Sequence, residues 1–156
     1  MLARRDVIVV SLARLPNAGG PRRPPACRSR SEEEYPIATV LIIDDDASVA
    51  KSISKLVRAV GHTPITAHSG EQGLEAVALQ IPDMIILDQL MPGMMGLEVL
   101  QVLRRDPRMA ELPIVMHCGN VDAAFEDEAK RSGATEVWVK GLCDLGEAVR
   151  RLVGSS

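Results

Sequence analysis

Residues 84–100 read MIILDQLMPGMMGLEVL, and a change of pattern within this stretch decides the fold. Its first four residues are all apolar, as in a strand that is buried on both faces. Asp88 follows directly, and Pro92 and Gly93 then mark a turn. From Gly96 the apolar residues recur at helical spacing. The stretch therefore predicts a strand, a loop and a helix, with a carboxylate at the carboxyl end of the strand.

The same alternation of apolar strand and amphipathic helix occurs five times between residues 38 and 153. The expected strands are 39–43, 63–67, 84–87, 113–118 and 135–139. The expected helices are 48–61, one that starts after Ser69, 96–106, 121–133 and 144–153. Strands that are apolar on both faces and alternate with helices indicate a parallel sheet covered on both sides. We therefore predict an α/β protein of five consecutive strand–helix units.

The composition excludes several classes of protein. The 156 residues are 46% hydrophobic and 25% charged, with a net charge of -3. This balance, with one Phe, one Tyr and one Trp, argues against direct nucleic-acid binding through a basic surface or through aromatic stacking. No apolar run approaches the roughly 20 residues that a membrane span needs. We expect a protein that contacts neither nucleic acid nor membrane.

The chain divides by composition near residue 37. Residues 1–36 contain five of the ten prolines, and their seven arginines against four acids give a local charge of +3. This segment has too little apolar surface to form a core of its own. We expect a disordered, basic, Pro/Arg-rich extension over 1–36 and one folded domain over 37–156.

The cysteines give the expected compartment. Cys27, Cys118 and Cys143 are far apart, odd in number and form no CxxC pair. This argues against a disulfide framework or a structural zinc site and fits a reducing, cytoplasmic setting. A redox pair of Cys118 and Cys143 is a remote alternative, if the last two strands are neighbours.

Reactive side chains follow four of the five predicted strands. They are Asp44, Asp45 and Asp46 after the first strand, Asp88 after the third, Cys118 at the end of the fourth and Lys140 after the fifth. The carboxyl ends of parallel strands meet at one edge of the sheet, where ligands of such folds bind. We therefore expect these side chains to share one site.

The residue types at that edge suit phosphoryl chemistry. Neighbouring carboxylates repel unless a cation joins them, and an all-oxygen ligand set suits a hard divalent ion such as Mg²⁺. An Asp carboxylate can act as a nucleophile and form an aspartyl phosphate, and a Lys ammonium can pair with a phosphate oxygen. One acidic turn alone would more often be solvated surface. Reactive residues after four strands instead indicate a functional site.

Four stretches resemble the receiver domain of two-component response regulators. They are LIIDDD at 41–46, MIILDQLMPGMMGLEVL at 84–100, PIVMHCG at 113–119 and GATEVWVK at 133–140. The resemblance runs from about residue 38 to 153 and implies a flavodoxin-like, doubly wound (βα)5 fold with the strand order 2-1-3-4-5. It also implies a phosphorelay protein that signals by protein–protein contact and is no enzyme beyond its own phosphorylation and dephosphorylation.

The resemblance also assigns roles at the sheet edge. Asp88 would be the phosphoacceptor, and Lys140 would pair with the phosphoryl group. Asp45, Asp88 and the backbone carbonyl of Leu90 would bind Mg²⁺ directly, with Asp44 helping through water. The donor would be a phosphohistidine on a sensor histidine kinase or a phosphotransfer protein. Because the chain ends just after the last predicted helix, we expect no output domain.

Three positions depart from the family's usual pattern. Cys118 stands where the family has Thr or Ser, and a thiol is a weaker hydrogen-bond donor than a hydroxyl. Val137 stands where Tyr or Phe is common, while Trp138 should face the other side of the strand and serve packing. Gly141 replaces the proline of a Lys-Pro pair with a cis bond, which predicts a trans bond or a rearranged loop.

Two other functions stay open. The departures would fit a degenerate receiver that acts as a binding module with weak or no phosphorylation switching. More remotely, Asp44 and Asp46 loosely resemble the motif of aspartate-nucleophile phosphatases, although these usually carry an added cap domain.

His117 beside Cys118 raises the question of a thiol nucleophile with its base. Successive side chains of a strand point to opposite faces, so the two should not meet. We expect Cys118 to face the site and His117 to be a hydrogen-bonded structural residue on the other face.

Overall fold

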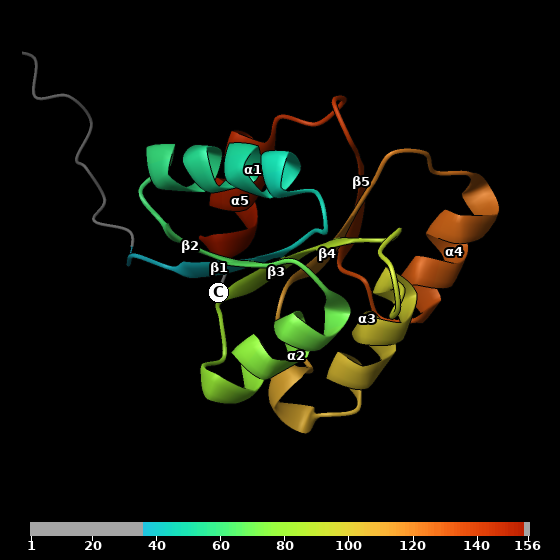
Figure 1. The fold of residues 1–156 in the computed structure, drawn as a ribbon. Coiled ribbons are helices and arrows are strands. Elements are labelled where there is room, and N and C mark those ends of the chain that lie inside the picture. The colour runs from blue at the N-terminus through green and yellow to red at the C-terminus, as the bar shows by residue number, and fades with distance from the viewer. Residues whose placement is uncertain (1–35, 155–156) are drawn as a thin grey trace, which may run out of the picture. The chain divides into compact units, whose positions relative to one another are not determined.

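A computed structural model describes residues 36–154 of the chain, which form one sheet of five parallel strands with helices on both sides (Figure 1). The strands are β1 (Thr39–Ile43), β2 (Thr63–Ala67), β3 (Met84–Asp88), β4 (Ile114–Cys118) and β5 (Glu136–Val139). The helices are α1 (Ala47–Ala59), α2 (Gly70–Leu79), α3 (Gly96–Arg104), α4 (Ala123–Arg131) and α5 (Leu145–Val153), with a short 3₁₀ turn, η1 (Pro107–Met109).

The strand order is β2-β1-β3-β4-β5, and every pair of neighbours is parallel. This confirms the predicted α/β class and strand order. The predicted extension lies outside the described residues except for Pro36, and so does Cys27.

Two apolar layers hold the helices to the sheet. α1 and α5 pack on one face, and α2, α3 and α4 pack on the other (Figure 1). In β1, Val40 and Ile42 join the α1/α5 layer, while Leu41 and Ile43 join the opposite layer. No helix within residues 36–154 is long and apolar enough to cross a membrane.

Strand alternation at the end of the sheet follows the prediction. Cys118 belongs to the α2/α3/α4 layer, whereas His117 lines a hollow with residues of α1. In β5, Val137 packs against the α2/α3/α4 layer and Trp138 is buried in the α1/α5 layer. The Trp138 indole nitrogen donates a hydrogen bond of 2.7 Å to Glu136. Trp138 therefore serves packing, as expected.

One arginine joins two connections at the amino end of the sheet, the one between α3 and β4 and the one between α4 and β5. The Arg104 guanidinium donates hydrogen bonds to the carbonyl oxygens of Gly133 at 2.9 Å, Leu112 at 2.8 Å and Met109. Burial lowers the pKa of Arg104 below its ordinary value. The side chain thus satisfies backbone groups that turns leave without partners in the ladder.

We predict that Arg104→Met lowers the free energy of unfolding by about 2 kcal/mol, because carbonyls near the protein interior lose their donors. Urea unfolding followed by the fluorescence of Trp138 measures the change. Arg105→Met is the matched control, since Arg105 is exposed and its loss should cost less than about 0.5 kcal/mol. Equal effects of the two variants would show that the Arg104 bonds do not stabilise the fold.

Candidate functional site

The predicted site residues meet at the carboxyl edge of the sheet. Asp44 directly follows β1, Asp88 ends β3, Cys118 ends β4 and Lys140 directly follows β5. The Lys140 amide donates to the Cys118 carbonyl at 2.8 Å, which extends the β4–β5 pairing by one residue. The strand order therefore gathers residues that lie far apart in the sequence.

Lys140 bridges two buried carboxylates. Its ammonium nitrogen lies 3.0 Å from Oδ2 of Asp44 and 3.0 Å from Oδ1 of Asp88. Asp44 is only 1% exposed and Asp88 only 5%. Two such carboxylates would repel each other strongly in a dry site, and the ammonium between them offsets this repulsion.

At this site burial and ion pairing shift the pKa values of Asp88 and Lys140 in opposite directions. Burial raises the pKa of Asp88 above its ordinary value; the charge of Asp44 adds to the rise, and the hydrogen bond from Lys140 opposes it. Burial alone would lower the pKa of Lys140, but its hydrogen bonds to Asp88 and Asp44 outweigh burial and raise it. Asp88 is thus a more basic carboxylate than an exposed aspartate.

Three carboxylates are close enough to share one metal ion. Oxygen atoms of Asp44, Asp45 and Asp88 all lie within 4.8 Å of one another. This donor set of oxygens only fits a hard divalent cation such as Mg²⁺. Leu90, whose backbone carbonyl is a predicted ligand, lies in the loop after β3 with its side chain 69% exposed.

The third acid of the DDD run has a different role. The Asp46 side chain caps α1 and accepts hydrogen bonds from the backbone amides of Ser48 at 2.8 Å and Val49 at 3.3 Å. In turn, the Asp46 amide donates to Oδ1 of Asp44 at 2.9 Å, so the helix start also orients the buried acid. An Asp just before a helix is a usual N-cap, so the sequence contained this signal.

Cys118 lies beside the site as a protonated thiol. Burial, with the negative charge of Asp88, raises its pKa to about 11, against the opposing effect of Lys140. Cys143 packs against the α1/α5 layer, on the other face of the sheet, and both cysteines are free. The remote alternative of a redox pair is therefore wrong.

His117 departs from its prediction in one respect. It is buried on the α1 side as expected, with 4% exposure, but its Nδ1 atom has no hydrogen-bond partner. The expectation of a hydrogen-bonded structural histidine is wrong for this atom. Burial, followed by the positive charge of Lys140, lowers the pKa of His117 to about 4, against the opposing effect of Asp44. The ring is therefore neutral at pH 7.

The loop after Asp88 depends on a close approach that sequence reasoning missed. The Gly96 amide donates to the Gln89 carbonyl at 3.0 Å, and the Gln89 side chain accepts from the Leu97 amide at 3.0 Å. A Cβ atom on Gly96 would lie 2.2 Å from the carbonyl oxygen of Asp88. The glycine is therefore required where α3 starts against the end of β3.

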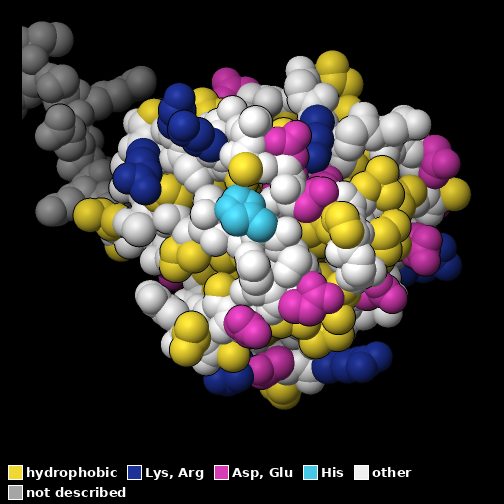
Figure 2. Space-filling view, viewed as in Figure 1, with side chains coloured by type: hydrophobic (Ala, Val, Ile, Leu, Met, Phe, Trp, Pro, Cys, Tyr) yellow, Lys and Arg dark blue, Asp and Glu magenta, His cyan; other side chains and the backbone are white. Residues whose placement is uncertain are grey.

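A histidine at the rim of the site was also missed. His68 follows β2, and its Nδ1 atom lies 3.2 Å from the carbonyl oxygen of Asp44. On one face of the molecule, acidic side chains, a histidine and apolar side chains lie close together (Figure 2). In the sequence, the signal for His68 was its position directly after the second predicted strand, which places it at the same edge of the sheet.

The loop after Lys140 differs from the Lys-Pro pattern. Gly141 has a φ of +82°, which a proline ring cannot adopt because it holds φ near -65°. The turn is closed by a hydrogen bond of 3.1 Å from the Leu142 amide to the Val139 carbonyl. The backbone at Gly141 therefore has a conformation that a proline at this position could not adopt, while the predicted trans bond or rearranged loop stays a prediction.

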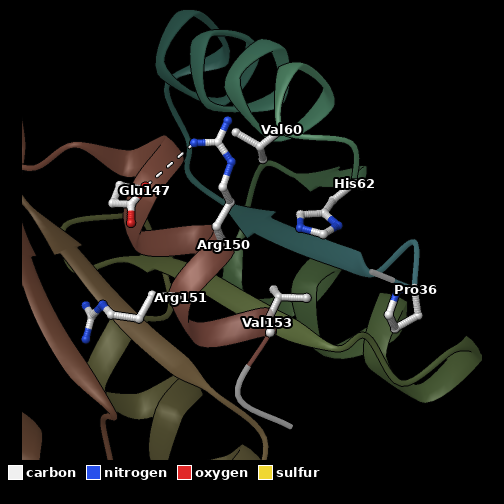
Figure 3. A pocket seen from close by; sticks show the side chains of 8 residues that line it. Pro36, Val60, His62, Glu147, Arg150, Arg151 and Val153 are labelled. Carbon is white, nitrogen blue, oxygen red and sulfur yellow. Dashed lines mark ion pairs between the residues drawn. The ribbon is translucent and has the colours of Figure 1, made fainter. Parts of the chain in front are cut away.

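A hollow of about 570 Å³ lies at the opposite, amino-terminal edge of the sheet, among Pro36, Val60, His62, Glu147 and the end of α5 (Figure 3). There Arg150 pairs with Glu147 at 3.7 Å. The arginines of this hollow stand at the carboxyl end of α5, where cations stabilise the helix dipole. None of the acids gathered around Lys140 lines it, so it is separate from the candidate site.

Comparison with known proteins identifies the family. The sequence profile of the "Response regulator receiver domain" family matches residues 40–150. Over 101 residues the chain is 36% identical to the DNA-binding response regulator MtrA of Mycolicibacterium paratuberculosis, covering 65% of this chain and 44% of MtrA. It is 34% identical over 102 residues to the transcriptional regulatory protein AfsQ1 of Streptomyces coelicolor, covering 65% of this chain and 44% of AfsQ1. The chain thus matches less than half the length of these relatives.

Solved structures share the fold. The chemotaxis protein CheY4 of Vibrio cholerae superposes with a TM-score of 0.71 at 29% identity, over 74% of this chain and 98% of CheY4.

We predict that Gly96→Ala lowers the free energy of unfolding by about 3 kcal/mol, because the new methyl group would overlap the backbone of Asp88. Chemical unfolding measures the loss. Gly119→Ala is the matched control: a Cβ there meets nothing within 4 Å, so its stability should stay close to that of the wild type. A Gly96→Ala variant as stable as Gly119→Ala would contradict the close approach.

His117 predicts a pH dependence of stability. Its folded pKa of about 4 lies below the ordinary value of 6.5, so between these values the unfolded chain binds more protons and stability falls as the pH falls. At pH 5 this should cost about 2 kcal/mol relative to pH 8. Urea unfolding at both pH values should show a smaller loss for His117→Leu than for the wild type. An unchanged loss in the variant would mean that His117 is not the group responsible.

Proposed function

The chain belongs to the response regulator receiver domain family, and from this premise we propose that Asp88 accepts a phosphoryl group in a phosphorelay and that the phosphorylated chain signals by contact with another protein. The observation that carries the proposal is the arrangement around Lys140. Its ammonium lies 3.0 Å from Asp88, and the oxygens of Asp44, Asp45 and Asp88 are within the reach of one cation. A nucleophile, a cationic partner and a metal site therefore stand together.

The chemistry needs few groups. One Asp88 oxygen attacks phosphorus, the bond from phosphorus to the donor nitrogen breaks, and the leaving imidazole keeps the electron pair and takes up a proton. The product is an acyl phosphate on Asp88. Lys140, which pairs with the Asp88 carboxylate before the transfer, then pairs with a negatively charged oxygen of the phosphoryl group. Cys118 stands where a weak thiol donor can contact that group.

The metal would be held by Asp45 and Asp88 directly, with the Leu90 carbonyl as a third ligand and Asp44 through water. When bound, Mg²⁺ neutralises negative charge on the transferring group. Asp44 also keeps Lys140 in place, since their charged atoms are 3.0 Å apart.

We further propose the partners and domain limits that this role implies. The folded receiver domain comprises residues 37–156, and the phosphoryl donor is a sensor histidine kinase or a phosphotransfer protein in the cytoplasm. Output is by protein contact and not by direct nucleic-acid binding. The relatives named as DNA-binding regulators are more than twice the matched length, so their activity does not transfer to this chain directly.

A degenerate receiver is the second candidate, favoured by three local observations. Cys118 offers a weak donor, Val137 offers no ring, and Gly141 has a φ of +82° that the usual proline could not adopt. Each weakens a step that would pass the phosphorylation signal on. This candidate predicts an intact pocket with little conformational response.

Incubation with acetyl phosphate and Mg²⁺ tests the proposed function. The intact protein should gain the mass of one phosphoryl group, and Asp88→Ala should gain none. The gain should disappear when EDTA removes the metal. Labelling of Asp88→Ala to the wild-type extent would overturn the assignment of the acceptor.

Neighbouring aspartates provide a matched pair of variants for the metal. Asp45→Asn should slow labelling by more than about tenfold, because it removes a charged oxygen ligand. Asp46→Asn should label at nearly the wild-type rate, because an Asn at this position can still cap α1. Equal slowing in both variants would mean that the acidic run acts by its total charge and not through a defined metal site.

A further inference from the structure

The hollow at the amino-terminal edge of the sheet is separate from the site around Asp88 and has the size of a ligand pocket. Its volume of about 570 Å³ is within the range that small-molecule sites in proteins occupy. Three parts of the chain form its walls, namely the residue before β1, the connection from α1 to β2, and α5 with the residue that follows it. A ligand in this hollow would therefore contact elements that lie far apart in the sequence.

One buried side chain presents a polar atom without a partner to this hollow. His62 is only 9% exposed, and its Nδ1 atom accepts a hydrogen bond of 3.4 Å from the Ala38 amide. A neutral imidazole that accepts at Nδ1 carries its hydrogen on Nε2. The Nε2 atom has no hydrogen-bond partner among residues 36–154 and, unlike Nδ1 of His117, is not closed to solvent. The hollow thus contains an N–H donor whose direction the fold fixes.

The His62 ring is neutral at pH 7 and lies close to an arginine. Burial, followed by the positive charge of Arg150, lowers the pKa of His62 below its ordinary value, against the opposing effect of Asp83. Figure 3 shows the His62 ring and the Arg150 side chain on neighbouring walls of the hollow. One ligand group can therefore contact both residues.

The two arginines of the hollow differ in how firmly they are held. Arg151 donates two hydrogen bonds to Glu136, at 2.7 and 2.8 Å. Arg150 pairs only with Glu147, at 3.7 Å, and both of these side chains are exposed. Such a long, solvated ion pair contributes little stability, so Arg150 can turn to a ligand at small cost. The hollow therefore offers one positive charge, which matches a ligand with a single negative charge.

The remaining walls and the shape of the guanidinium define the ligand further. Val60, Val153 and the Pro36 ring are apolar and suit an apolar body. A guanidinium pairs with a planar carboxylate through two parallel hydrogen bonds, and a carboxylate oxygen has a further lone pair for the His62 N–H group. The dipole of α5 explains arginines at its carboxyl end, but it does not explain the open Nε2 atom of His62.

We propose that this hollow binds a small-molecule monocarboxylate with an apolar body. The carboxylate pairs with Arg150 and accepts a hydrogen bond from Nε2 of His62, and the apolar body packs against Val60 and Val153. The bound molecule joins α5 to the connection between α1 and β2 and so stabilises the folded chain. The inference is independent of the proposed function, since none of the acids around Lys140 lines the hollow.

Binding of 2-naphthoate to the full chain, followed by NMR, tests the chemistry of the hollow. Its matched control is 2-naphthamide, which has the same shape but no charge. We expect a dissociation constant of about 1 mM for 2-naphthoate and about tenfold weaker binding of 2-naphthamide. In wild-type protein, 2-naphthoate should move the Nε2 resonance of His62 more than its Nδ1 resonance. Equal binding of the two compounds, a larger shift at Nδ1, or no shift of His62 would overturn the proposal.

Variants of the ion pair test the role of Arg150. Arg150→Met should remove the preference for 2-naphthoate over 2-naphthamide. Arg131→Met, in α4 on the other face of the sheet, is the matched control and should keep this preference. Glu147→Gln should bind 2-naphthoate about twofold more tightly, because the competing carboxylate of an exposed ion pair is lost. A preference that survives Arg150→Met, or weaker binding by Glu147→Gln, would contradict the assigned contact.

Two further measurements test the kind of anion and the effect on stability. Inorganic phosphate, added in excess, should not displace 2-naphthoate, and displacement would assign the hollow to phosphate groups instead. At about ten times its dissociation constant, 2-naphthoate should lower the equilibrium constant of unfolding about elevenfold in urea titrations. An unfolding equilibrium that 2-naphthoate leaves unchanged would show that the compound does not bind the folded chain specifically and would overturn the proposal.

Discussion

The ion pairs of Lys140 with Asp44 and Asp88 are the interactions on which the site depends. The lysine and Asp44 are 96 residues apart in the sequence, yet their charged atoms are 3.0 Å apart. This contact requires β1, β3, β4 and β5 to be neighbours in that order, with their carboxyl ends level. Two buried carboxylates so close together would destabilise the folded chain without a cation. The fold therefore concentrates negative charge at this edge of the sheet and holds one ammonium group between the two buried carboxylates.

The last two residues of β4 point to opposite faces of the sheet, beside the site. Cys118 lies in the α2/α3/α4 layer, and burial raises its pKa to about 11, so it meets the site as a thiol. His117 lies on the α1 side, where its neutral ring lines a hollow that also contains Lys140. The two side chains therefore have different surroundings, because strand alternation sends them to opposite faces of the sheet.

The sequence predicts much of this arrangement because its strongest signals are local. Strands that are apolar on both faces predict the parallel sheet. The acids and the lysine that follow these strands predict a common site at the carboxyl edge of that sheet. The contacts of Arg104 with three carbonyls and the approach of Gly96 to Asp88 depend on how distant loops meet, which no local pattern reports. The unpartnered Nδ1 of His117 was missed for the same reason, since its surroundings come from α1 and the loop after β5.

The central claim is that the acids and Lys140 form one site that holds a phosphoryl group together with Mg²⁺. Fluorine NMR of the chain with beryllofluoride, which mimics the phosphoryl group, tests it directly. We expect a bound fluoride signal that requires Mg²⁺, is absent in Asp88→Ala, and appears together with a change in Trp138 fluorescence. A folded wild-type chain that gives no bound signal with Mg²⁺ would contradict the claim and leave a degenerate receiver.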